Sequence, residues 1–241
     1  MNVVYYSQED KRWKNTPYTI DGDAGETIGA SGCGPTSFAM AASTYLGEEI
    51  QPPEMCQYAI KNGYRTANNG TAWGFFASAA KSFGLQCIQT GSLEAAKAAL
   101  KEGKLVIASM GKGHFTGGGH FILLVGVTKD GWIDVYDPNH DNTKYGADGL
   151  VDQGVRNDGK VTAKESVFKS EAKQYWIISN PNQEQEEKEL DKAKVIAYGK
   201  QIKDGLLIGN TVYVPLRAVA EARGDKVAWD NTTKTATITA K

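Results

Sequence analysis

The chain has 241 residues, a formal net charge of −1, an apolar fraction of 41% and a charged fraction of 23%. This length suits one good-sized domain with a small second one. The near-neutral charge provides no basic field for nucleic acid, and the lack of an apolar run of about 18 residues excludes membrane insertion through a spanning helix.

The first part of the chain predicts helices after a loop-rich start. Residues 1–30 contain several glycines and polar side chains and predict loops. Apolar residues at helical spacing predict helices at residues 35–46, 53–62, 72–83 and 92–102, and residues 85–88 predict a strand between the last two. Ser92 suits the N-terminal cap of the last of these helices.

Strands dominate the next part. Residues 105–110, 120–127, 132–137 and 174–178 predict strands, the second and third joined by a turn at residues 129–131. Residues 138–165 are polar and rich in Gly and Asp and predict mostly loop, which is either a substrate gate or a surface excursion. Helices followed by an antiparallel sheet predict an α+β domain over residues 1–179.

The composition changes at residue 180. Residues 180–194 are mostly polar and charged and predict a linker. Residues 195–241 predict a small α/β module with strands at 195–198, 206–208, 211–214, 226–229 and 235–239 and a helix at 215–222. A block this small has a marginal core, so a homodimer formed through this module is one expectation.

The three cysteines are too few, and odd in number, for a disulfide framework. Cys56 and Cys87 fall in a predicted helix and strand and are interpreted as packing residues. Cys33 differs because Gly32 and Gly34 flank it and Pro35 opens a helix. A thiol at a helix N-terminus faces unpaired N–H groups and the positive end of the helix dipole, which favour thiolate. We therefore predict Cys33 as a nucleophile, with Gly32 and Gly34 leaving room for substrate.

A cysteine nucleophile needs a base and a group that orients the base. His120 begins a predicted strand after three glycines, of which Gly119 leaves room for substrate, and Asp137 ends the next strand. In an antiparallel pair the start of one strand lies beside the end of the next, so His120 and Asp137 are predicted to meet.

Other assignments compete with this pair. His114 is an alternative base in a glycine-rich loop, and Asn139 is an alternative orienting residue. A metal site formed by His114, His120, His140 and nearby Asp residues fits no familiar ligand spacing, so we expect no metal and no cofactor. Gln8 is a candidate oxyanion donor beside the backbone N–H of Cys33.

These residues, in this order, resemble a known family. The segments Tyr6-Ser7-Gln8, Gly32-Cys33-Gly34-Pro35-Thr36, Gly119-His120-Phe121-Ile122 and Asp137-Pro138 resemble papain-fold cysteine peptidases of the bacteriocin-processing type, the double-glycine-leader-peptidase-like family thirty-nine. The resemblance covers residues 1–179. It implies a papain-like fold with Cys33 as nucleophile, His120 as base, Asp137 as orienting residue and Gln8 in the oxyanion hole.

The last block resembles a second family. Residues 211–221 and 227–230 are similar to the small domain named after the N-terminal region of copper amine oxidase. The block contains no His and no Cys, so we expect no copper there. The resemblance implies attachment to a cell surface or cell wall.

Together these features predict a peptidoglycan hydrolase of the phage endolysin kind, with bacterial peptidoglycan as its partner. The scissile bond is a peptide bond or the N-acetylmuramoyl-L-alanine amide. The N-terminus carries no signal peptide, which suits synthesis in the cytoplasm and release at host lysis to act on the wall. The alternatives are a leader-peptide-processing protease and a non-catalytic wall-binding protein.

Overall fold

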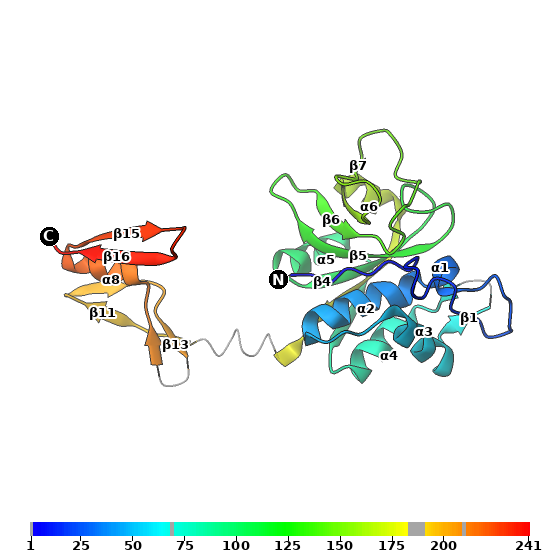
Figure 1. The fold of residues 1–241 in the computed structure, drawn as a ribbon, viewed down its shortest axis with the longest axis horizontal. Helices are drawn as coiled ribbons and strands as arrows, with labels where there is room; N and C mark the ends of the chain where they lie inside the picture. The colour runs from blue at the N-terminus through cyan, green and yellow to red at the C-terminus, as the bar shows by residue number, and fades with distance from the viewer. Residues whose placement is uncertain (1, 68–69, 183–190, 209–210) are drawn as a thin grey trace. The chain divides into compact units, whose positions relative to one another are not determined.

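The computed structural model describes residues 2–67, 70–182, 191–208 and 211–241. The chain divides into two compact units, Met1–Asn180 and Pro181–Lys241 (Figure 1). No helix among these described residues is long and apolar enough to cross a membrane.

In the described part of the first unit, six helices pack around a large sheet. They are α1 (Ile28–Ser31), α2 (Cys33–Leu46), α3 (Pro52–Lys61), α4 (Gly74–Ser82), α5 (Leu93–Lys101) and α6 (Glu165–Glu171). A small hairpin of β1 (Arg65–Thr66) and β2 (Gly70–Thr71) lies between α3 and α4 in the sequence. The Ser92 side chain accepts a hydrogen bond from Ala95 N, which confirms the predicted cap of α5.

The sheet has seven antiparallel strands in the order β3-β9-β4-β5-β6-β8-β7. They are β3 (Gln86–Thr90), β4 (Leu105–Met110), β5 (His120–Val127), β6 (Ile133–Tyr136), β7 (Val151–Asp152), β8 (Lys160–Ala163) and β9 (Ala172–Ser179). The four predicted strands from 105 to 178 are therefore present, and the last of them lies in the interior of the sheet. The predicted α+β class is confirmed.

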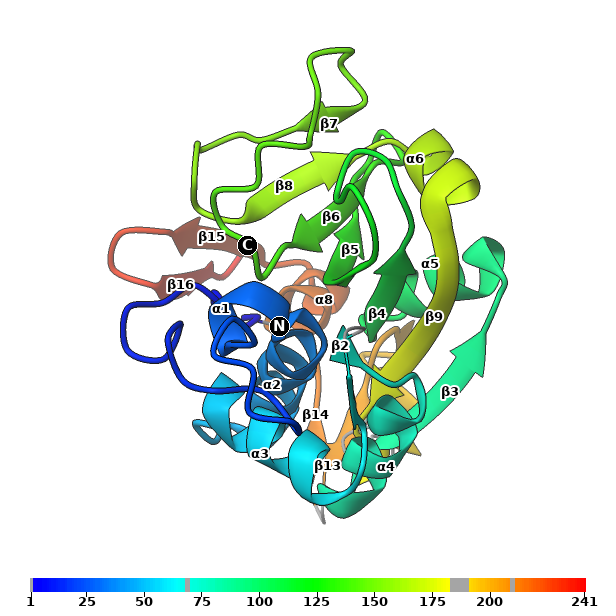
Figure 2. The same ribbon diagram turned by 90° about the vertical axis from the view of Figure 1, so that its right-hand side faces the viewer.

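Two apolar clusters cover the two faces of this sheet. On β4, Leu105 and Ile107 point into one cluster and Val106, Ala108 and Met110 into the other, as strand alternation requires. Buried residues of α2, α3 and α4 belong to the first cluster, and those of α5 and α6 belong to the second. Figure 2 shows α2, α3 and α4 on one side of the sheet and α5 and α6 on the other. Helix α2 is buried along most of its length because it packs between the sheet and α3.

Residues 138–165 are mostly loop, as the sequence predicts, but they also contain two short strands that the sequence does not predict. The segment contains β7 and β8, and β8 pairs with β6 from Ile133↔Ala163 to Tyr136↔Lys160. Only two apolar residues of β8, Val161 and Ala163, are buried. A four-residue strand with so short an alternation is hard to distinguish from a polar loop.

The described residues of the second unit include short strands and the helix α8. Its strands are β10 (Asp191–Lys192), β11 (Val195–Ala197), β12 (Lys200–Ile202), β13 (Leu206–Ile208), β14 (Thr211–Tyr213), β15 (Lys226–Asp230) and β16 (Thr235–Thr239). They form a sheet β10-β13-β14 and two hairpins, β11-β12 and β15-β16. Helix α8 (Leu216–Arg223) ends at Gly224, whose φ of 100° suits glycine.

Strand β10 falls within residues 180–194, which the sequence predicts as a linker. Its backbone pairs with β13, and such pairing needs no apolar side chain, so the polar sequence gives no sign of it. Residues 183–190 of the predicted linker lie outside the described residues.

Candidate active site

Cys33 is the first residue of α2 and is half-buried. The first N–H groups of a helix have no intrahelical acceptor, so they face the thiol with the positive end of the dipole. Burial raises the pKa of Cys33, but hydrogen bonds from His120 and from the backbone N–H groups of Phe121 and Gly34 outweigh it. The pKa of Cys33 therefore lies below its ordinary value, as a nucleophilic thiol requires.

His120 and Asp137 form a buried pair, with His120 Nε2 at 2.7 Å from Asp137 Oδ1. His120 is the first residue of β5, and Asp137 follows the last residue of β6. Leu123 pairs with Tyr136, and one further step in this register would bring Asp137 opposite Ile122. Because His120 lies two residues before Ile122, the side chains of His120 and Asp137 are directed to the same face of the sheet. The contact predicted from the strand ends is present.

The charge on Asp137 determines the state of His120. Burial lowers the pKa of His120, but the carboxylate of Asp137 and the neighbouring Cys33 raise it to about 10. The imidazole is thus protonated at neutral pH beside a thiol whose pKa is lowered. This arrangement favours a thiolate–imidazolium pair.

The other two histidines have different partners. His114 contacts Glu171 and Asp148, and His140 contacts Ser7 and Glu9. The backbone N–H of Asn139, not its side-chain amide, contributes to the pair by donating to Asp137 Oδ1 at 2.9 Å. The geometry thus favours His120 and Asp137 over the alternatives His114 and Asn139.

Gln8 is buried next to the turn that leads into Cys33. Its backbone N–H donates to Pro138 O at 2.9 Å, and its side-chain Nε2 donates to Gly29 O at 2.6 Å. Gly29 lies in α1, four residues before Cys33. A side-chain amide has a second N–H besides the one given to Gly29, and the oxyanion role of Gln8 stays a prediction.

The three glycines predicted to contact substrate differ in their surroundings. A Cβ on Gly32 would lie 2.6 Å from Ile28 O, and one on Gly34 would lie 3.1 Å from Thr71 and 3.2 Å from Phe121. Packing within the protein therefore explains these two. A Cβ on Gly119 would meet nothing within 4 Å, so only Gly119 borders open space.

Glu9, His140 and Asp141 are the three metal-ligand side chains that converge within the described part of the chain, with ligand atoms within 4.8 Å of one another. Hydrogen bonding accounts for this cluster. With its amide nitrogen facing them, Asn139 donates to Glu9 Oε2 at 2.8 Å and to Asp141 Oδ1 at 3.1 Å.

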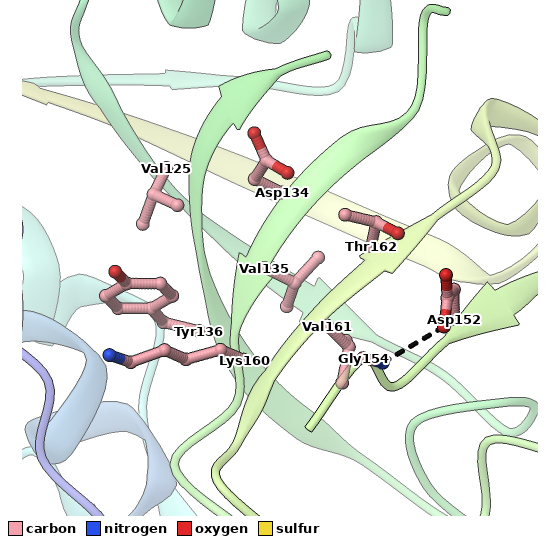
Figure 3. Close-up of a pocket in the computed structure, with 9 residues that line it drawn as sticks. All are labelled: Val125, Asp134, Val135, Tyr136, Asp152, Gly154, Lys160, Val161 and Thr162. Atoms are coloured by element: carbon pink, nitrogen blue, oxygen red, sulfur yellow. Dashed lines mark hydrogen bonds between the residues drawn. The ribbon is translucent and has the colours of Figure 1, made fainter. Parts of the chain in front are cut away.

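A pocket of about 380 Å³ is lined by residues of β5, β6, β7 and β8 (Figure 3). Its lining includes Asp134, Asp152 and Lys160, and Lys160 Nζ lies 5.3 Å from the ring centre of Tyr136. Burial raises the pKa of Asp134. None of the four predicted catalytic side chains lines this pocket, although Tyr136 directly precedes Asp137.

The sequence-based prediction missed two side chains of the site. Asn142 and Tyr145 both donate to Asp137 Oδ2, at 2.9 Å each. They lie in the segment predicted as a loop, where an Asn and a Tyr among many polar residues give no periodic signal.

Residues 1–153 match the family model described as the Peptidase_C39 like family. The chain belongs to this family. It is therefore a cysteine peptidase by family, and its large antiparallel sheet with N-terminal helices is the papain-like fold that the sequence predicts.

Two solved structures are similar to the chain. One is the peptidase domain of Streptococcus ComA, a bi-functional ABC transporter involved in a quorum-sensing pathway, with a TM-score of 0.43 and 17% identity over 68% of this chain and 95% of that one. The other is a putative C39-like peptidase from Bacillus anthracis, with a TM-score of 0.44 and 16% identity over 74% and 94% of the two chains. No curated protein matches the sequence.

Residues 191–241 match the model of the copper amine oxidase N-terminal domain. Copper in proteins is held mainly by His, Cys and Met. Residues 191–241 contain none of these three types, so this part of the chain does not fit a copper site.

Proposed function

We propose that the protein is a thiol-dependent peptidoglycan hydrolase that cleaves an amide bond in the peptide part of the bacterial cell wall. The bond is a peptide bond or the amide between N-acetylmuramic acid and L-alanine. The observation that carries the hydrolytic chemistry is the pairing of Cys33, at a helix N-terminus, with the buried His120–Asp137 couple.

The first half of the reaction forms a thioester. The Cys33 thiolate attacks the amide carbonyl carbon, and the resulting oxyanion accepts hydrogen bonds from the backbone N–H of Cys33 and from the Gln8 amide. The imidazolium of His120 gives its proton to the leaving amine as the C–N bond breaks.

The second half releases the acyl group. Neutral His120 removes a proton from water, and the hydroxide attacks the thioester carbonyl carbon. The C–S bond breaks, the carboxylic acid leaves, and the proton returns to the Cys33–His120 pair. Asp137 keeps the imidazole oriented and stabilises its charged form in both halves.

The second unit supports the choice of a wall polymer as substrate. Its exposed large residues include Tyr198, Tyr213 and Trp229, which are 62%, 53% and 55% exposed. Trp229 pairs with Ala236 and Val227 with Ile238, so these four residues share one face of the β15-β16 hairpin. Exposed aromatic and aliphatic side chains on so small a unit are typical of a binding surface.

The test of the catalytic part uses a suspension of Gram-positive cell walls. The parent is expected to clear it, whereas Cys33→Ala clears nothing and still sediments with the walls. Mass spectrometry of the released fragments identifies the bond. Clearing by Cys33→Ala contradicts the thiol mechanism. A parent that leaves walls intact but cleaves a peptide after a double glycine supports leader-peptide processing instead.

The test of the binding part uses Trp229→Ala in the full chain. The matched control is Trp73→Ala, which removes a tryptophan of the first unit that is 45% exposed. Trp229→Ala is expected to weaken sedimentation with walls while Trp73→Ala does not. Equal binding by both variants contradicts a wall-binding role for the β15-β16 face.

A further inference from the structure

Every polar atom of Asp137 has a partner, on the backbone as well as on the side chain. Its N–H donates to Gly159 O at 2.7 Å, and its carbonyl oxygen accepts from Tyr5 Oη at 2.8 Å. Gly159 directly precedes β8, and Tyr5 belongs to the N-terminal segment. The backbone of Asp137 is thus fixed from two directions.

The carboxylate of Asp137 is fully buried and accepts four hydrogen bonds. Oδ1 accepts from His120 Nε2 at 2.7 Å and from Asn139 N at 2.9 Å. Oδ2 accepts from Asn142 Nδ2 and from Tyr145 Oη, both at 2.9 Å. Asn142 and Tyr145, which take no part in the proposed chemistry, therefore both bind Oδ2, whereas His120 binds Oδ1.

Asn142 and Tyr145 are themselves held in place. Asn142 Nδ2 also donates to Phe115 O at 2.8 Å, and its Oδ1 accepts from Lys144 N at 2.9 Å. Tyr145 is 3% exposed, and its ring lies edge-on to Phe115 with 5.6 Å between ring centres. Phe115 belongs to the loop that leads into His120. The two donors therefore join the segment after Asp137 to the segment before His120.

We propose that Asn142 and Tyr145 are positioning residues that hold Asp137 Oδ2 so that Oδ1 stays directed at His120 Nε2. The proposal rests on the thiol mechanism of the proposed function. The last torsion of an Asp side chain is broad, so a carboxylate without donors on Oδ2 is free to turn away from the imidazole. A fixed carboxylate accepts the N–H of His120 Nε2 and so keeps a proton on that nitrogen. The other ring nitrogen, Nδ1, is then left to exchange a proton with Cys33.

The experiment measures how fast iodoacetamide alkylates Cys33 as the pH is varied, in the full-length protein. Mass spectrometry of the Cys33 peptide separates this thiol from Cys56 and Cys87, and no wall substrate is needed. A carboxylate that turns away from the imidazole stabilises the imidazolium of His120 less. The Cys33 thiolate then forms only at higher pH. We expect Tyr145→Phe and Asn142→Ala each to raise the midpoint by about 0.5 pH unit and to slow wall clearing by roughly tenfold.

The matched control is Tyr175→Phe. Tyr175 is also 3% exposed in the same apolar cluster, but its hydroxyl faces Phe168 O at 3.5 Å, away from Asp137. This variant is expected to keep the midpoint of the parent, even if its melting temperature falls as much as that of Tyr145→Phe.

Two results overturn the proposal. One is a midpoint unchanged in both Tyr145→Phe and Asn142→Ala, and the other is the same shift in Tyr175→Phe. If one of the two variants does not fold, the midpoint of the other decides. Failure of the parent to clear walls overturns only the proposed substrate, because the alkylation midpoint reports on the thiol without it.

Discussion

Glu171, the last residue of α6, holds His114 with both of its carboxylate oxygens. Oε2 accepts from the backbone N–H of His114 at 2.8 Å, and Oε1 faces the ring nitrogen Nδ1. The second ring nitrogen, Nε2, lies 3.0 Å from Asp148 Oδ2. Because His114 lies in the loop that leads into His120, this pair fixes the entry to the proposed catalytic strand.

The His114 contacts predict a loss of stability at alkaline pH. The hydrogen bond with Glu171 raises the pKa of His114, burial opposes the rise, and Asp148 adds to it. A pKa raised in the folded state gives stability that is full below the unfolded value of about 6.5 and is lost as the pH rises through the folded value.

His114→Gln removes this contribution, so the free energy of unfolding of the parent should exceed that of the variant by about 1–3 kcal/mol at pH 5.5 and by less at pH 8.5. Urea unfolding at the two pH values measures the difference. An equal gap at both pH values shows that the charge on His114 does not contribute.

We predict that Asp137→Asn narrows the pH range of activity on the alkaline side. Asp137 is among the groups that raise the pKa of His120 to about 10, so the parent should keep clearing walls until His120 loses its proton near that pH. The neutral amide removes the charge, lowers the pKa of His120 and moves the alkaline fall in activity to lower pH.

Rates of wall clearing between pH 6 and pH 10.5 measure this effect, with Asp134→Asn as a control. Asp134 is a carboxylate on β6, the strand that Asp137 follows, and it lines the pocket of Figure 3, which none of the predicted catalytic side chains lines. If both variants lower equally the pH at which wall clearing falls, the effect does not come from the specific contact of Asp137 with His120.

The contact between His120 and Asp137 could be predicted from the sequence because it depends on strand ends. A glycine triplet, an apolar strand, a turn and an alternating strand are all local signals, and antiparallel pairing then brings the two residues together. Other local signals, Pro35 and the apolar residues at helical spacing after it, predict α2 and the place of Cys33 at its start.

The donors to Asp137 Oδ2 could not be predicted in this way. Asn142 and Tyr145 reach Asp137 through a segment with no repeating pattern, and the pairing of β8 with β6 that frames it involves a strand with only two buried apolar residues. Contacts of this kind depend on tertiary packing and leave no periodic signal in the chain.

We predict that the buried ion pair between Arg65 and Glu26 stabilises the N-terminal loop. It is 3% exposed, its Nη2 lies 2.9 Å from Glu26 Oε2, and its Nε donates to Tyr18 O at 2.6 Å. Replacing one partner of a buried ion pair leaves the other charge uncompensated, so Arg65→Met should lower the free energy of unfolding by about 3–5 kcal/mol.

Denaturant unfolding of the single variants and of Arg65→Met with Glu26→Gln completes a double-mutant cycle. The double variant should recover part of the loss, because it removes the uncompensated carboxylate. Additive effects of the two substitutions contradict a coupled pair.

We predict different outcomes for replacing Gly34 and Gly119 by alanine. In Gly34→Ala the new Cβ lies 3.1 Å from Thr71 and 3.2 Å from Phe121, so these two side chains must move by a few tenths of an ångström next to Cys33. Overpacking of this kind costs about 1–3 kcal/mol, which exceeds the gain of up to about 1 kcal/mol from replacing Gly by Ala in a helix. Gly34→Ala should therefore melt earlier and alkylate more slowly at Cys33.

Gly119→Ala is the matched control for the fold and a test of the predicted substrate contact. Its Cβ meets nothing within 4 Å and its φ is not positive, so its melting temperature and the alkylation of Cys33 by a small reagent should stay at the parent values. If substrate lies over Gly119, the added methyl group reduces wall clearing while small-reagent alkylation is unchanged. Clearing at the parent rate removes Gly119 from the substrate site, whereas a fall in melting temperature shows that protein atoms, not substrate, occupy the space beside it.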